Sequence, residues 1–181
     1  MPRLLAPDLP STLQAFMRDQ CHLSPTRFQP LPGDRVPQPA RQLLVHDRDM
    51  TTTLATFHES PLRVEILQSL ITDGLYIREV FLRTTASDTI VEYGVIGIAL
   101  EQFTPEQQHA ITSGAAPLGA LLHRFQIPFV SAPIGFFAVC GEALAATPLR
   151  PPKSSTCHGR FNRLSRASGE SLAWILEILP A

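Results

Sequence analysis

Two charged side chains, Arg78 and Glu177, stand alone within runs that are otherwise apolar. Burying a guanidinium or a carboxylate is costly unless an opposite charge or hydrogen-bonding groups meet it. The simplest interpretation is that the two side chains form an internal ion pair. The alternative is a closed pocket in which Arg78 binds an anionic ligand at one end and Glu177 acts as an acid or base at the other. The residues alone leave both interpretations open.

The alternation of side chains along a predicted strand explains why Arg78 should be buried. Residues 75–83 are rich in aromatic and β-branched types and lie between turn signals, which is typical of a strand. Side chains alternate between faces, so Arg78 shares its face with Tyr76, Val80 and Leu82. Both faces of this strand are largely apolar, and we expect it to lie inside a sheet.

The same reasoning applies to Glu177 at the C-terminal end of the chain. The last predicted strand, Ser171–Leu179, places Glu177 on one face with Ala173, Ile175 and Leu179. Desolvation on such a face should raise the pKa of the carboxyl group, unless a cation lies nearby.

These two strands belong to a larger set of strand signals, which predicts an α+β fold with antiparallel pairing. The first three follow one another through short turns, as in a meander, and the last two form a hairpin. The fourth contains two prolines, which favours a bent or edge strand. The predicted strands are residues 62–70, 75–83, 90–100, 127–139, 159–167 and 171–179.

One predicted helix carries a candidate site residue. Met50, Leu54 and Phe57 form an apolar stripe at helical spacing, and either Asp47 or Asp49 could cap the helix. By pattern alone, Met50 is a core residue.

Further helices are predicted from Ser11, after Thr104 with a capping box, and over residues 117–122. We expect residues 1–9 to form a loose arm. The five prolines of residues 24–39 predict a connector without regular structure.

Composition narrows the classes of function. The length fits one domain, residues 1–181, with residues 1–40 as an N-terminal helix and proline-rich arm. The sequence lacks a basic cluster with interleaved aromatics, which argues against nucleic acid, and lacks an apolar run long enough to span a membrane. Cys21, Cys140 and Cys157 show no metal-ligand spacing, so we expect no metal site. Three thiols and no signal peptide favour the cytoplasm.

Four short motifs, in this order and spacing, resemble the chorismate pyruvate-lyase family, and most closely its branch outside the enterobacterial ubiquinone pathway. The resemblance covers roughly residues 42–180. The motifs are Asp-Met-Thr at 49–51, Tyr-Ile-Arg-Glu-Val at 76–80, Pro-Leu-Gly-Ala-Leu-Leu at 117–122 and Leu-Glu-Ile-Leu-Pro at 176–180.

The resemblance implies an activity, a fold and a set of site residues. Members of the family remove pyruvate from chorismate and leave 4-hydroxybenzoate, without metal or cofactor. They have a six-stranded antiparallel sheet, with helices and flap-like loops that cover one side and enclose the ligand. By this resemblance Arg78 binds the ring carboxylate, Glu177 lies at the ether and hydroxyl end, and the backbones of Met50 and Leu118 line the site. It favours two ends of one pocket over an Arg78–Glu177 ion pair, and it implies product inhibition.

One departure bears on the substrate. The ubiquinone-pathway form has a second arginine where this chain has Val95. We therefore expect Arg160, Arg163 or Arg83 to meet the second carboxylate of chorismate. Two alternatives stay open: a lyase for a related chorismate-derived substrate in quinone or aromatic secondary metabolism, and a sensor domain of the same fold for an aromatic acid. The sequence does not determine the oligomeric state.

Overall fold

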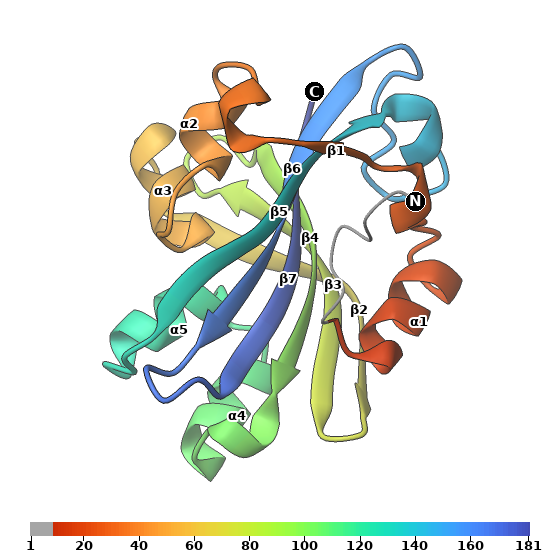
Figure 1. Cartoon of the computed structure of the whole chain (residues 1–181). Helices are drawn as coiled ribbons and strands as arrows, with labels where there is room; N and C mark the ends of the chain where they lie inside the picture. Colours follow the sequence, from red (N-terminus) through yellow and green to blue (C-terminus); the bar gives the residue numbers. More distant parts are fainter. Residues whose placement is uncertain (1–8) are drawn as a thin grey trace.

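One antiparallel sheet of seven strands forms the centre of the computed structural model, which describes residues 9–181 (Figure 1). Every pair of neighbouring strands is antiparallel, so the predicted α+β class and antiparallel pairing are confirmed. Across the sheet the strands are β1 (Gln29–Leu31), β5 (Val130–Cys140), β6 (Thr156–Ser165), β7 (Ser171–Leu179), β4 (Ile90–Ala99), β3 (Leu75–Thr84) and β2 (Leu62–Thr72).

The meander and the hairpin formed as their turn residues predict. β2 and β3 are joined by Asp73 and Gly74, whose φ angles are 49° and 76°. Gly169, with φ 104°, closes the β6–β7 hairpin. A positive φ is the conformation that glycine adopts without steric cost. The largest shifts are at β6, which spans Thr156–Ser165 rather than residues 159–167, and at β5, which begins at Val130 rather than at residue 127.

The predicted count of six strands is wrong because β1 forms within the proline-rich connector. Its three residues pair with residues 136–138 of β5. Proline has no N–H to donate, so a strand that contains Pro30 is tolerated at a sheet edge, which is where β1 lies. The expected loose arm of residues 1–9 lies outside the described residues, apart from Leu9.

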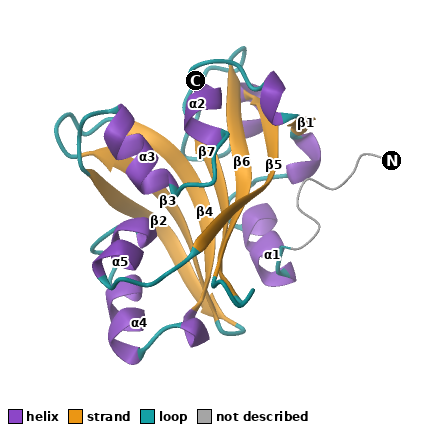
Figure 2. Cartoon of the chain, turned by 60° about the vertical axis from the view of Figure 1, so that its left-hand side comes forward, coloured by secondary structure: helices purple, strands orange, loops and turns teal. Residues whose placement is uncertain are grey.

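In the described part of the chain, five α-helices cover both faces of the sheet (Figures 1 and 2). The expectation that helices cover one side is therefore incomplete, because α1 packs against the opposite face from the others. At nine residues α1 is the longest, and no helix within residues 9–181 combines the length and apolarity that crossing a membrane requires. The helices are α1 (Ser11–Asp19), α2 (Ala40–Leu44), α3 (Met50–Phe57), α4 (Pro105–Thr112) and α5 (Leu118–Arg124).

Side-chain caps begin α3 and α4. The Asp49 carboxylate accepts a hydrogen bond from the backbone N–H of Thr52 at 2.8 Å, so Asp49 caps α3. The predicted capping box at the start of α4 is present, between Thr104 and Gln107. Phe57 ends α3 and is 41% exposed, so the predicted stripe is buried only in its first two members. Asp49 therefore fixes where α3 begins above the sheet.

The apolar packing differs between the two faces. The α1 face holds one cluster, which joins α1 to side chains from β3, β4, β5, β6 and β7. The other face holds two clusters: one beneath α4 and α5, the other beneath α2 and α3. Charged side chains lie between these two clusters.

Candidate functional site

Strand register places Arg78 and Glu177 on the same face of the sheet. Arg78 on β3 lies opposite Ile96 on β4, and Glu177 on β7 lies opposite Gly94 on β4. Arg160 on β6 lies opposite Glu177. Arg78 and Glu177 are thus two strands and one two-residue step apart, roughly 12 Å between Cα atoms at standard sheet spacings. That separation suits two ends of one site better than a direct contact.

A cavity of ≈ 50 Å³ lies between these strands and the helices above them. The sheet contributes Arg78, Glu92 and Glu177 to its lining, α3 contributes residues 49–51 at its start, and α5 contributes residues 117–119. All four residues expected from the sequence, including Met50 and Leu118, therefore line one cavity.

Arg78 is buried, and no carboxylate of residues 9–181 pairs with its charge. Only 2% of the residue is exposed, and its Nε atom has no hydrogen-bond partner within residues 9–181. One Nη atom lies 3.4 Å from the carbonyl oxygen of Ile111, a long contact, and the guanidinium carbon lies 5.8 Å from the ring centre of Tyr76. Burial lowers the pKa of Arg78, but a guanidinium keeps its proton in proteins. The interpretation of an Arg78–Glu177 ion pair is wrong.

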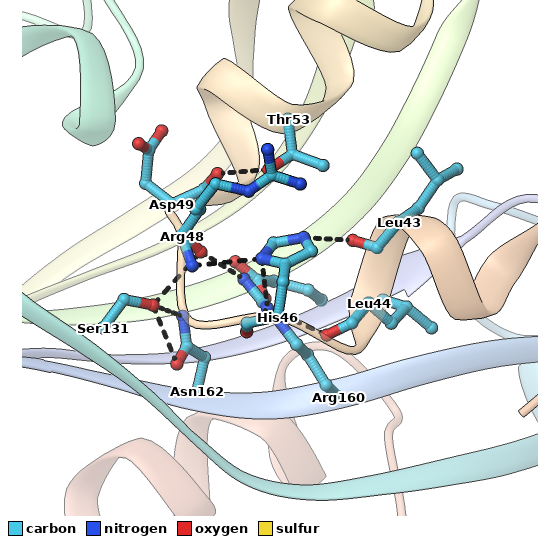
Figure 3. A network of polar contacts seen from close by, with 10 residues as sticks. Leu43, Leu44, His46, Arg48, Asp49, Thr53, Ser131, Arg160 and Asn162 are labelled. Carbon is cyan, nitrogen blue, oxygen red and sulfur yellow. Dashed lines mark hydrogen bonds and ion pairs between the residues drawn. The ribbon is translucent and has the colours of Figure 1, made fainter. Parts of the chain in front are cut away.

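Glu177 is paired instead with Arg160, whose residue is fully buried. Figure 3 shows the Arg160 side chain beside Leu44 and His46. The Arg160 Nε group donates to Glu177. One Nη group donates to the backbone carbonyl oxygens of Leu44 at 2.9 Å and His46 at 3.0 Å. The other Nη group donates to the backbone carbonyl oxygen of Arg48 at 3.2 Å. Burial raises the pKa of Glu177, and the charge and hydrogen bond of Arg160 oppose that rise. Arg160 thus connects β6 and β7 to the loop between α2 and α3.

Glu92 is a site residue that the sequence reasoning missed. It is 4% exposed, and its Oε2 atom has no hydrogen-bond partner in the described chain. Burial raises the pKa of Glu92 well above its usual range, and the neighbouring charge of Glu177 raises it further. The signal was present, because Glu92 stands alone between apolar residues of a strand just as Glu177 does.

The two unpartnered atoms found among buried side chains of residues 9–181 line this same cavity. They are Arg78 Nε and Glu92 Oε2. Buried polar atoms in proteins are nearly always hydrogen-bonded, and an exception calls for a specific explanation. A donor without an acceptor and an oxygen without a partner, in one cavity, are what a site for a polar ligand would contain.

None of the three arginines proposed to replace the missing second arginine is a free cation in the cavity. Arg160 is occupied by Glu177 and by carbonyl groups. Arg83 pairs with Glu65, and Arg163 is absent from the cavity lining. The Val95 side chain packs in the apolar cluster on the α1 face. Arg78 is therefore the one arginine or lysine in the cavity lining that the described residues supply.

The helices that cover the cavity are held together by polar contacts. His123 Nε2 on α5 lies 3.0 Å from an Asp49 carboxylate oxygen at the start of α3. Gly119 permits this approach, because a Cβ atom there would lie 2.8 Å from Asp49 Oδ1 and 2.9 Å from Thr51 Oγ1. The cavity is about a third of the ~150 Å³ that accommodates benzene in an engineered protein cavity. The cavity as it stands is therefore too small to enclose a whole benzoate-sized ligand.

Comparison with known proteins adds no assignment to this geometry. No family model matches the chain, and no curated protein matches it. Residues 9–181 also bring no three His, Cys, Asp or Glu side chains together in a group that could hold a metal ion. The chemistry of the site is therefore argued from Arg78, Glu92, Glu177 and Arg160.

Proposed function

We propose that this chain is a cytoplasmic chorismate pyruvate-lyase, which converts chorismate to 4-hydroxybenzoate and pyruvate without metal or cofactor. One observation carries the proposal: Arg78, whose Nε atom has no partner among the described residues, and the buried carboxyl groups of Glu92 and Glu177 lie at different ends of one cavity. The sequence resemblance supports it independently, because its four motifs supply Met50, Arg78, Leu118 and Glu177 to that cavity.

Arg78 would hold the ring carboxylate of the ligand. A planar guanidinium binds a carboxylate through two parallel hydrogen bonds, which fixes the orientation of the ring as well as its position. The interaction gains strength because Arg78 is already desolvated and because no carboxylate of the described residues competes for it.

The carboxyl pair would manage protons at the other end of the ring. The reaction breaks the carbon–oxygen ether bond and removes a proton from the adjacent ring carbon, which leaves an aromatic ring. The products are strongly favoured, so the protein needs mainly to orient the substrate and move two protons. A positioned acid or base typically contributes ~10²–10⁴-fold to the rate. Glu92 and Glu177 have different surroundings, because only Glu177 is paired with Arg160. Two such carboxyl groups are suited to share one proton.

A covered cavity also predicts slow release of the product. We expect α3 and α5 to lie over the bound ligand, and the contact between Asp49 and His123 links these two helices. We expect product inhibition by 4-hydroxybenzoate. We also expect the melting temperature to rise when this product is added, because a ligand that binds only the folded state stabilises it.

A second candidate function is a binding module for an aromatic acid with one carboxylate. The observation that favours it is the single unpaired cation in the cavity lining, since chorismate has two carboxylates. Such a module, or a lyase for a related substrate with one carboxylate, would use Arg78 in the same way.

Incubation of the purified chain with chorismate separates these functions. Pyruvate is measured with a coupled dehydrogenase, 4-hydroxybenzoate by its absorbance, and binding by calorimetry. We expect stoichiometric release of both products by the wild type. The Arg83→Met variant should behave alike, since Arg83 lies on the same strand outside the cavity, whereas Arg78→Met should lose activity. Binding of 4-hydroxybenzoate without pyruvate release would establish the binding module. If the chain shows no activity and no binding, both functions are refuted.

A further inference from the structure

We infer that Glu92 is the proton donor of this site, a neutral carboxylic acid held beside an ionised Glu177. The inference rests on the proposed lyase function. It also assigns the two acid–base roles differently from the sequence, which pointed to Glu177 alone.

Hydrogen-bond partners distinguish the two carboxyl groups. Both residues are almost fully buried, at 4% and 2% exposure. Glu177 contacts the guanidinium of Arg160, whereas Glu92 contacts no cation of the described residues, and one of its oxygens has no partner among them. Two carboxylates in one buried site cannot both ionise cheaply, and the one positive charge of Arg160 compensates one of them. The negative charge therefore belongs on Glu177 and the proton on Glu92.

Gly94 brings the two carboxyl groups to the same place. It lies opposite Glu177 in the β4–β7 pairing and two residues after Glu92 on the same face. A Cβ atom on Gly94 would lie 3.1 Å from Glu92 Oε1 and 3.3 Å from the carbonyl oxygen of Leu176. The Glu92 side chain thus lies across the glycine, toward β7 and Glu177.

Two further charged groups at this end of the cavity act on Glu177 in opposite directions. Arg160 reaches Glu177 from β6 and lowers its pKa, whereas the negative charge of Asp49, at the start of α3, raises it. Arg78, on β3, lies toward the other end of the cavity. Burial and the charge of Glu177 raise the pKa of Glu92, while the charge of Arg160 lowers it. Together with the ion pair of Glu177, these effects favour the proton on Glu92.

With the proton on Glu92 and the negative charge on Glu177, the two carboxyl groups can carry out both proton transfers of the reaction. The Glu92 hydroxyl gives its proton to the ether oxygen as the carbon–oxygen bond breaks and its electron pair moves onto that oxygen. The Glu177 carboxylate takes the proton from the adjacent ring carbon, and the electrons of that carbon–hydrogen bond form the new ring double bond. The released enol becomes pyruvate by tautomerisation. Transfer of the proton from Glu177 to Glu92 then restores the starting state.

Infrared spectroscopy of the protein without ligand tests where the proton resides. We expect a carbonyl stretching band of a neutral carboxylic acid at pH 7 in the wild type. The band should disappear in Glu92→Gln and persist in Glu79→Gln, which removes a buried glutamate from the opposite face. Persistence of the band in Glu92→Gln would overturn the inference, whatever the outcome of the activity assay.

Steady-state release of pyruvate tests the acid role. Glu92→Gln should lower turnover by ~10²-fold or more, while 4-hydroxybenzoate affinity stays within about tenfold because the amide keeps the shape of the neutral acid. Glu79→Gln should retain wild-type turnover. A Glu92→Gln variant with wild-type turnover would overturn the inference and leave the lyase function intact. A wild type that releases no pyruvate would refute the function, and with it the acid role.

Discussion

The two buried arginines on the cavity side of the sheet differ in what meets their guanidinium groups. Arg160 is fully buried and donates to Glu177 and to three backbone carbonyl groups. Arg78 is 2% exposed and has one long contact to a carbonyl. The two arginines are therefore buried to nearly the same extent, and they differ in how many hydrogen-bond partners their guanidinium groups have. A buried charge with hydrogen-bond partners can join parts of the fold, whereas one without them costs stability, which fits the binding role proposed for Arg78.

Two buried glutamates on opposite faces of the sheet repeat the contrast. Glu79, on the α1 face, accepts hydrogen bonds from the hydroxyl of Tyr93 and from the side chain of Gln68. Glu92, on the cavity face, has an oxygen without a partner among residues 9–181. Within the described residues, the α1 face thus hydrogen-bonds its buried carboxylate, and the cavity face does not. The comparison supports the proposal that the ligand site lies on the cavity face.

The largest effect should come from removing the satisfied arginine. Arg160→Met leaves Glu177 buried without its cation, which should lower the free energy of unfolding by about 3–5 kcal/mol. Urea denaturation measures this. Arg83→Met is the control, because the ion pair of Arg83 with Glu65 is partly exposed and should contribute less than about 1 kcal/mol. An Arg160→Met variant as stable as the wild type would contradict the structural role of Arg160.

Removing the unsatisfied arginine should weaken binding and leave stability intact. Arg78→Met removes a charge-assisted hydrogen bond to the ligand, worth about 1.5–3 kcal/mol, so 4-hydroxybenzoate should bind roughly 10- to 150-fold more weakly. The unfolding free energy should equal or exceed that of the wild type, because an uncompensated buried charge has been removed. Calorimetry and urea denaturation measure the two quantities. Arg78→Lys, which keeps the charge without the planar fork, should bind with intermediate affinity.

If affinity is unchanged in a folded Arg78→Met variant, Arg78 does not bind the ligand carboxylate. If stability falls as far as in Arg160→Met, the contrast between the two arginines is lost.

The pH dependence of stability sharpens the contrast between the glutamates. Burial raises the pKa of Glu92 above its ordinary value of 4.5. The folded protein then binds more protons than the unfolded chain, so this contribution to stability is complete below pH 4.5 and is lost as pH rises through the folded pKa. Glu92→Gln cannot lose a proton, so it should be more stable than the wild type at pH 8 and equally stable at pH 4. Glu79→Gln provides the control, and denaturation at both pH values is the measurement.

The smallest effect on stability should come from breaking the contact between His123 on α5 and Asp49 at the start of α3. The His123 side chain is 56% exposed, so His123→Ala should lower the free energy of unfolding by less than about 1 kcal/mol. Release of 4-hydroxybenzoate should nevertheless become several-fold faster, because α5 loses its contact with Asp49. Stopped-flow dissociation tests this against His109→Ala, an exposed histidine on α4. Equal release rates would show that the contact does not hold the cover closed.

Within the described residues, the sequence by itself determined six of the seven strands, four of the five α-helices and which side chains share a face. These features depend on neighbours a few residues apart: the alternation that grouped Arg78 with Val80, the turn at Gly74 and the capping box at Thr104. They are local, and the structure agrees with them. The same alternation could have identified Glu92, because it is visible in residues 90–96 alone.

Only the tertiary structure decided which charges meet. Arg160 reaches Glu177 across the β6–β7 pairing and the carbonyl of Leu44 from 116 residues away. The register of strands far apart in the chain, and the placement of a loop above them, leave Arg78 two strands from Glu177. Alternation gives the face of a side chain, but it does not give the neighbouring strand or the register. The partner of a buried charge, and hence the difference between a structural arginine and a binding one, depends on both.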